Sequence, residues 1–248
     1  MAQPMDIKTL VEELKRQGRA LMLPDMTDRS KLALDEQGLT KLLEMAYCRQ
    51  VAKRRIKYVP NDLTSGAIRQ LAHFLTDSHD NRFMIVLDGS TATGKTTLMQ
   101  AMRQTLWWLA EHRLVSDEVN LKICDAVALS DMRDSTRQWY DLMNWPSYLG
   151  IEDLGCEPAE ILRWGNPLYP VREVITERYK LRLPMVVSTN LDSDQLREHL
   201  GLRIVSRMNE MAYYIHFENV DFRKMNWFSH HPEVKSEKDY ETGYSNKH

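Results

Sequence analysis

The sequence predicts an α/β fold in which helices cover both faces of a parallel β-sheet. Two observations support this prediction. Short apolar stretches rich in β-forming residues alternate with amphipathic stretches along most of the chain, an order typical of βαβ units. One apolar stretch, residues 83–87, runs directly into Gly89-Ser90-Thr91-Ala92-Thr93-Gly94-Lys95-Thr96, a glycine-rich loop that a further amphipathic stretch follows.

The glycine-rich loop has the pattern G-x-x-x-x-G-K-T, which is typical of phosphate binding. Its glycines let the backbone curl so that successive N–H groups point at phosphate oxygens, and the following helix adds its positive end. We expect Lys95 to reach the β- and γ-phosphates and the Thr96 hydroxyl to hold Mg²⁺. A glycine turn with an exposed lysine is the alternative, but it does not account for the strand before the loop. The expected nucleotide contacts are Gly89, Ser90, Thr91, Ala92, Thr93, Gly94, Lys95, Thr96 and Thr97.

Composition restricts the protein class. The chain has 248 residues, 43% of them apolar, and a net charge of −2, so whole-molecule attraction to nucleic acid is not expected and any such contact must be a local patch. Its three cysteines are widely separated and show no C-x-x-C spacing, which argues against a zinc ribbon or a disulfide framework. The N-terminus lacks the apolar core of a signal peptide, and no run of 18 apolar residues exists. We therefore expect a reduced, cytoplasmic protein with no membrane segment.

Residues 1–60 are expected to form a helical N-terminal region. Asp6 can cap a first helix, and a second runs from about residue 35 to residue 57. Residues 49–57 contain five cations and no acid. They are either a solvated helix end that the macrodipole favours, or a docking surface for a nucleic-acid backbone or an acidic partner.

The remaining chain is expected to form one nucleotide-binding domain, residues 61–228, and a polar tail, residues 229–248, that we expect to be disordered because it lacks hydrophobic periodicity. The domain boundary is expected at Pro60-Asn61-Asp62. After a helix over residues 64–77, five strands are expected in order, separated by helices: 83–87, 119–124, 147–151, 184–190 and 213–217. The intervening helices are expected over 98–109, up to 143, 171–179, 193–200 and 203–211.

Polar residues follow two of these strands. Glu152 and Asp153 end the third strand, where the first could hold Mg²⁺ and the second could polarise an attacking water. Asn190 ends the fourth strand and could orient that water. Because ligands gather at the carboxyl ends of parallel strands, the glycine-rich loop, the acidic pair and Asn190 are expected to converge. Two acids capping a strand at a turn remain the alternative for the acidic pair.

Three arginines near the end of the domain are candidates for charge stabilisation. Arg203 and Arg207 lie four residues apart, on one face of a short helix. Either could be an arginine finger inserted into the site of a neighbouring subunit, although a surface helix with arginines is usually only solvated. Arg223 follows the last strand and is a candidate for contacting the γ-phosphate in its own subunit.

With these motifs in place, the chain resembles the AAA+ ATPases of the DnaC/DnaI helicase-loader and IstB transposition-helper group over residues 61–227. AAA+ proteins are P-loop NTPases of the ASCE type. The resemblance implies ATP and Mg²⁺ as ligands, Asn190 as the polar sensor, Arg207 or Arg203 as the finger and Arg223 as the second sensor. It also implies that no full C-terminal helical lid follows. The resemblance rests on the sequence stretches GSTATGKT, YLGIEDLGCEP, WGNPLYPVREVITERY, LPMVVSTNL, GLRIVSRM and VDFR.

Two departures from the family pattern matter. The acidic pair normally begins with aspartate, whereas Glu152 comes first here, which predicts altered metal coordination and slow hydrolysis. Some loaders also carry an N-terminal cysteine cluster for zinc, which Cys48 alone cannot form. The partner of residues 1–60 is therefore not determined by the resemblance.

The leading functional prediction is an ATPase that loads or remodels a replicative helicase on single-stranded DNA. Residues 1–60 would engage the helicase, and ATP would lie between the subunits of a homo-oligomer. One alternative is a transposition helper that engages a transposase and coats duplex DNA. Another is a nucleotide-dependent interaction switch that does not hydrolyse ATP, which the order Glu152-Asp153 keeps open.

Overall fold

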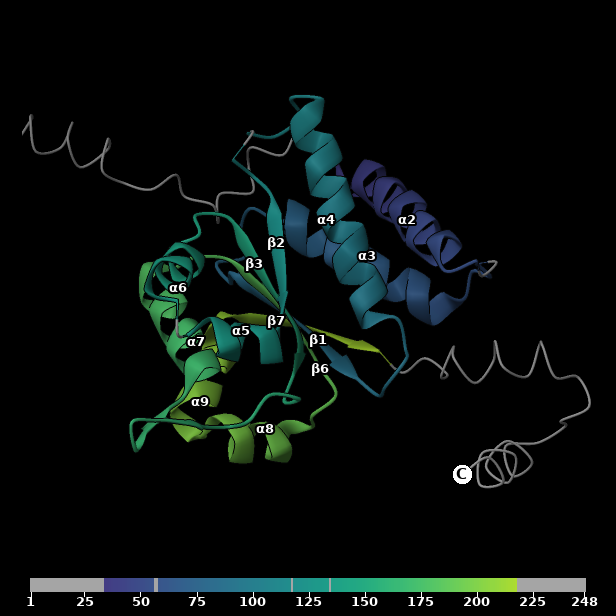
Figure 1. The fold of residues 1–248 in the computed structure, drawn as a ribbon. Coiled ribbons are helices and arrows are strands. Elements are labelled where there is room, and N and C mark those ends of the chain that lie inside the picture. Colours follow the sequence, from purple (N-terminus) through teal and green to yellow (C-terminus); the bar gives the residue numbers. More distant parts are fainter. Residues whose placement is uncertain (1–33, 56–57, 117, 134, 218–248) are drawn as a thin grey trace, which may run out of the picture.

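The computed structural model describes residues 34–55, 58–116, 118–133 and 135–217. Five parallel strands form its main sheet in the order β2-β3-β6-β1-β7 (Figure 1). They are β1 (Met84–Gly89), β2 (Leu121–Asp125), β3 (Tyr148–Leu154), β6 (Met185–Thr189) and β7 (Ala212–Phe217). The predicted α/β class with a parallel sheet is therefore confirmed.

The strand order decides which motifs become neighbours. β6 lies between β1, which leads into the glycine-rich loop, and β3, which carries the acidic pair. Because all three strands are parallel, their carboxyl ends open on one edge of the sheet. The loop, the pair and the residue that follows β6 therefore meet at that edge, as the sequence predicts.

Two helices, α3 (Asp62–Thr76) and α4 (Lys95–Glu111), cover one face of the sheet, and α2 (Glu36–Lys53) packs on them from outside (Figure 1). The Asp35 side chain caps α2 by accepting from the Gly38 N–H, and Asn61 caps α3 by accepting from the Thr64 N–H. Leu39 and Leu43 of α2 are fully buried in the same apolar cluster as Ile85 of β1. The described part of residues 1–60 thus packs on the nucleotide-binding domain, and its role as a separate partner-binding region stays a prediction.

The other face is covered by five helices: α5 (Ala126–Met132), α6 (Thr136–Met143), α7 (Pro170–Leu181), α8 (Ser193–Leu200) and α9 (Leu202–Met211) (Figure 1). The sequence predicts one helix between β2 and β3, whereas the structure has two. Ser135, at the N-cap position of α6, has an extended backbone conformation that separates the two helices, and its side chain makes no capping hydrogen bond. In the folded chain, Arg178 of α7 is buried and donates hydrogen bonds to the carbonyls of Trp145, Ser147 and Pro184.

A two-stranded antiparallel hairpin between β3 and α7 is absent from the sequence prediction. It consists of β4 (Ile161–Arg163) and β5 (Asn166–Leu168), joined by Trp164 and Gly165. Three-residue strands are too short for a periodic signal, and two-residue hairpin turns are normally recognised by Asn-Gly or Asp-Gly. The Trp-Gly pair lacks that signal.

Several expectations fall on residues that the structure does not describe. The first helix near Asp6, the C-terminal end of the 49–57 cationic stretch, Arg223 and the tail 229–248 lie outside the described residues. Within the described ranges, no helix combines the length and the apolarity needed to cross a bilayer.

Candidate nucleoside triphosphate site

The glycine-rich loop between β1 and α4 has the backbone of an anion-binding turn. Gly89, Ala92 and Gly94 have positive φ angles of 131°, 62° and 109°, and such reversals of the backbone let neighbouring N–H groups converge. A Cβ at residue 89 would lie 2.3 Å from the Phe217 carbonyl oxygen, so only glycine fits where the loop leaves β1. The Thr93 hydroxyl donates to the Ser90 carbonyl at 2.9 Å, which closes the turn.

Lys95 is the first residue of α4, and its side chain lies inside the loop. The residue is only 5% exposed. Its ammonium donates to the carbonyls of Gly89 and Ser90 at 2.7 and 2.6 Å and to Asn190 Oδ1 at 2.8 Å. Burial lowers the pKa of Lys95, and the charges of Asp153 and Asp88 oppose that shift. The buried ammonium thus lies inside the glycine-rich loop with its three donors bonded to protein oxygens, and its contact with phosphate stays a prediction.

A bulge in β3 sets the direction of the acidic pair. Ile151 pairs with Val187 and Leu154 with Thr189, so Glu152 and Asp153 together oppose a single residue of β6. Asp153 has a φ angle of 55°, and its N–H donates to the Ser188 hydroxyl at 3.1 Å. Successive residues of a regular strand point to opposite faces, and a bulge relieves that constraint.

Glu152 contacts α4 directly, whereas Asp153 affects that helix only through its charge. Glu152 Oε1 accepts a hydrogen bond from Gln100 Nε2 at 3.0 Å, while the charge of Asp153 raises the pKa of Lys95. Burial raises the pKa of Glu152, and the charges of Asp153 and Asp125 raise it further. Asp125 is the register partner of Glu152 on β2.

The donor set fits a magnesium ion held between Thr96 and Glu152. Thr96 and Gln100 lie four residues apart and therefore share one face of α4, and Glu152 is hydrogen-bonded to Gln100 on that face. Mg²⁺ is usually bound by one or two carboxylates together with phosphate oxygens and waters, so one hydroxyl and one carboxylate suffice. In the described ranges, no group of three or more His, Cys, Asp or Glu is arranged for a metal.

The structure brings most of the predicted site together, but Arg203 and Arg207 of α9 do not join it, and Arg223 lies outside the described residues. Hydrogen bonds of Lys95 link the loop to Asn190, and the charge of Asp153 acts on Lys95. Arg207 of α9 instead donates to the Thr176 hydroxyl at 3.1 Å, and its guanidinium lies over the Tyr179 ring, 5.1 Å from the centroid. Arg203 is exposed on the same helix. A role for either arginine in a neighbouring subunit stays a prediction.

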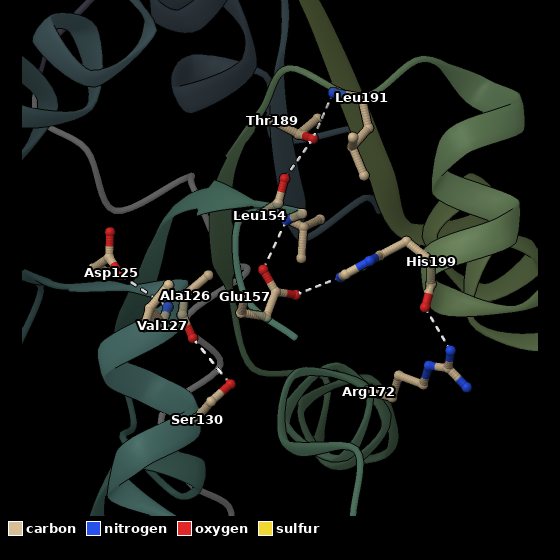
Figure 2. Close-up of polar contacts among 11 residues, drawn as sticks. Asp125, Ala126, Val127, Ser130, Leu154, Glu157, Arg172, Thr189, Leu191 and His199 are labelled. Atoms are coloured by element: carbon tan, nitrogen blue, oxygen red, sulfur yellow. Dashed lines mark hydrogen bonds and ion pairs between the residues drawn. The ribbon is translucent and has the colours of Figure 1, made fainter. Parts of the chain in front are cut away.

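A buried polar network behind the acidic pair was not predicted (Figure 2). The Glu157 side chain is 2% exposed. One of its oxygens accepts from the Gly155 N–H at 2.7 Å, and the other lies 2.8 Å from His199 Nε2, at the end of α8. Arg172 of α7 donates to the His199 carbonyl. We call Glu157, His199 and Arg172 the Glu157 latch; in the sequence, each reads as an ordinary surface residue.

The segment that leads to Glu157 is also hydrogen-bonded to the end of β6, the strand that precedes Asn190. The Thr189 hydroxyl donates to the Leu154 carbonyl at 2.8 Å and accepts from the Leu191 N–H at 3.1 Å (Figure 2). Gly155, with a φ angle of 101°, lies so close to Leu191 that an added Cβ would be 2.4 Å from Cδ1. The segment after the acidic pair is therefore fastened to the segment that carries Asn190.

Solved structures of DNA replication proteins are similar to this chain. The DnaC helicase loader matches with 21% identity and a TM-score of 0.49 over 65% of this chain and 93% of that chain. DnaI matches with 23% identity and a TM-score of 0.48 over 64% and 87%. AMPPCP-bound DnaA from Aquifex aeolicus matches with 16% identity and a TM-score of 0.46 over 73% and 56%. No family model and no curated protein matches the chain.

The parallel strand order, the glycine-rich loop and the buried Lys95 are those of a P-loop NTPase fold. The likeness to these structures has identities below 25% and TM-scores below 0.5. At these identities and TM-scores it is a likeness of fold alone, and it carries no information on activity.

Proposed function

We propose that this protein binds ATP with Mg²⁺ and hydrolyses it. The observation that carries the proposal is the position of the Lys95 ammonium, which bonds both the loop carbonyls and Asn190. Lysine inside the loop would neutralise phosphate charge, and Asn190, one strand away, would contact the water that attacks it. ATP is favoured over GTP by the motif resemblance.

Each site residue has a distinct part in this reaction. The loop amides and Lys95 would bind the β- and γ-phosphates, while Thr96 and Glu152 would hold Mg²⁺. The ion, when bound, supplies positive charge that offsets the developing charge on the phosphate oxygens. Asp153 would take a proton as water oxygen bonds to the γ-phosphorus and the bond to the bridging β–γ oxygen breaks, with Asn190 orienting the water.

The finer proposal is a helicase-loader-like role in DNA replication. The ordered motif set from GSTATGKT to VDFR supports it, together with an N-terminal region available for a protein partner. In this proposal residues 1–60 engage a replicative helicase, single-stranded DNA is the nucleic acid, and subunits share ATP sites. Arg207, or Arg203, acts on the nucleotide of the neighbouring subunit.

A second candidate function is an ATP-dependent interaction switch without turnover. It is favoured by Glu152, whose oxygen is occupied by Gln100 and whose pKa is raised. A protonated or hydrogen-bonded glutamate is a weaker metal ligand than a free carboxylate.

Phosphate release by the full-length protein, measured with and without single-stranded DNA, tests these functions. The ATPase function is supported if the unchanged protein releases phosphate steadily, Lys95→Ala does not, and the surface variant Lys180→Ala still does. Lys180 is a suitable control because, among the described residues, it pairs only with Glu177 of its own helix. ATP binding without release supports the switch. Electron microscopy with ATP then separates loader from transposition helper: a ring or short spiral on a helicase favours the former, and long filaments on duplex DNA favour the latter.

A further inference from the structure

The hairpin formed by β4 and β5 presents an apolar tip to solvent. Trp164 is 92% exposed and Leu162 is 73% exposed, more than the 59% of Trp107 on α4. Large apolar side chains are costly to leave in water, and the site described above uses neither of them. This tip is therefore a candidate contact surface.

Turn chemistry does not account for the tryptophan. Trp164 and Gly165 form the two-residue connection with φ angles of 52° and 79°, both in the left-handed region. That conformation belongs to a type I′ turn, where Asn-Gly and Gly-Gly are the favoured pairs. A bulky side chain is disfavoured at the first position. Trp164 thus stands where neither packing nor backbone conformation calls for it.

The base of the hairpin is braced on both sides. Before β4, Glu157 pairs with the His199 ring; after β5, Arg172 donates to the His199 carbonyl. The Tyr169 hydroxyl donates to Glu160 at 3.1 Å across the base, and the Arg172 guanidinium lies 4.5 Å from the Tyr169 ring centroid. Because both ends are tied to the same residue of α8, the tip projects from a fixed support.

The small size and the charge of the hairpin tip favour single-stranded nucleic acid as its binding partner. A stable protein interface buries about 800 Å² per partner with roughly 20–30 residues, which two three-residue strands and their turn cannot supply. A stacked base needs only one aromatic face, and a nearby cation to meet the backbone phosphate. Arg163 is the sole charged residue in the segment 161–168, and the carboxylate directly before that segment, Glu160, accepts a hydrogen bond from the Tyr169 hydroxyl at the base of the hairpin.

We infer that Trp164 stacks on a base of single-stranded nucleic acid while Arg163 meets its backbone. The inference rests on the proposed function only in taking DNA as the nucleic acid on which this protein acts. It adds a contact residue at the start of WGNPLYPVREVITERY, a stretch that carries the sequence resemblance but to which the sequence analysis assigns no role. The Glu157 latch connects this element to the segment after the acidic pair.

Fluorescence anisotropy of a labelled oligothymidylate with the full-length protein tests the inference. Trp164→Ala is expected to weaken binding by about tenfold or more, and Trp164→Phe to restore most of it, because the stacking face is retained. Trp107→Ala is the matched control, since it removes another exposed tryptophan, and it is expected to bind as the unchanged protein does. Equal binding by Trp164→Ala and Trp107→Ala, or no binding by the unchanged protein, overturns the inference.

ATP hydrolysis without DNA, measured on the same variants, separates this inference from the proposed function. Trp164→Ala is expected to keep DNA-free turnover, because the tip does not contact the nucleotide site. If the unchanged protein binds the oligonucleotide through Trp164 yet releases no phosphate, the proposed function fails and the inference stands. If Trp164→Ala weakens capture of a protein partner and leaves oligonucleotide binding unchanged, the tip is a protein contact and the inference is wrong.

Discussion

Lys95 Nζ and Asn190 Oδ1 lie 2.8 Å apart, although 95 positions separate them in the sequence. The contact exists because β6 is inserted beside β1, so the residue after β6 reaches the first residue of α4. It joins the group expected to grip phosphate to the group expected to orient water. A substitution at either residue therefore removes a hydrogen bond of the other.

Lys95→Ala is expected to weaken ATP binding by at least about tenfold, because hydrogen bonds to charged groups contribute about 1.5–3 kcal/mol each. Calorimetry or a fluorescent ATP analogue measures the affinity. Lys180→Ala, which removes an exposed lysine of α7, is the control and should bind ATP normally. Unchanged affinity in Lys95→Ala would remove the basis of the site.

ATPase activity is expected to fall as the pH is lowered, and the fall should occur at a pH above the ordinary glutamate pKa. Burial raises the pKa of Glu152 above its usual 4.5, and the protonated carboxyl cannot hold Mg²⁺. The measurement is the pH profile of kcat/KM for MgATP, compared between the unchanged protein and Gln100→Ala. Losing the Gln100 hydrogen bond, which lowers the Glu152 pKa, should move the acid limb to higher pH.

The same shift affects stability in a defined direction. The folded-state pKa of Glu152 exceeds the unfolded value, so the folded protein binds more protons in that window and its stability falls as pH rises through it. Glu152→Gln, which removes the charge and keeps the shape, should therefore raise the unfolding midpoint at neutral pH without nucleotide. A lowered midpoint would show that the charge is satisfied in the fold.

Arg207→Ala is expected to lose turnover by about a thousandfold while retaining ATP binding, as expected for an arginine finger. A finger acts across subunits, so mixing Arg207→Ala with Lys95→Ala subunits should restore part of the turnover at interfaces that join an intact loop to an intact arginine. Arg203→Ala is the matched comparison on the same helix face. Loss of binding and turnover together would assign Arg207 to its contacts with Thr176 and Tyr179.

His199→Ala should destabilise the fold by about 1–3 kcal/mol, because it leaves the Glu157 carboxylate buried with one partner fewer. Urea unfolding measures the change. His73→Ala is the control, since His73 and Glu36 form a pair in which both side chains are about half exposed, and such pairs contribute about 0–1 kcal/mol. Equal effects in the two variants would mean that the latch adds nothing to stability.

Much of the fold follows from local pattern. All five main strands and the helix after the loop were predicted within a few residues, because apolar periodicity and the glycine-rich loop are local signals. The bulge at Glu152-Asp153, the hairpin tip at Trp164 and the Glu157 latch were not. A bulge depends on the partner strand, and a buried carboxylate is distinguished from a surface one only by what packs against it.

By itself, the sequence determined the backbone turn of the glycine-rich loop and the order in which strands and helices follow each other. These depend on residue type and spacing along the chain, which local sterics and hydrogen bonding translate directly into backbone conformation. Tertiary structure alone decided that Lys95 meets Asn190, that Glu152 meets Gln100 of α4, and that Glu157 lies buried against His199. The reason is physical: strand order and burial are properties of the packed chain, and they bring together groups that no local pattern relates.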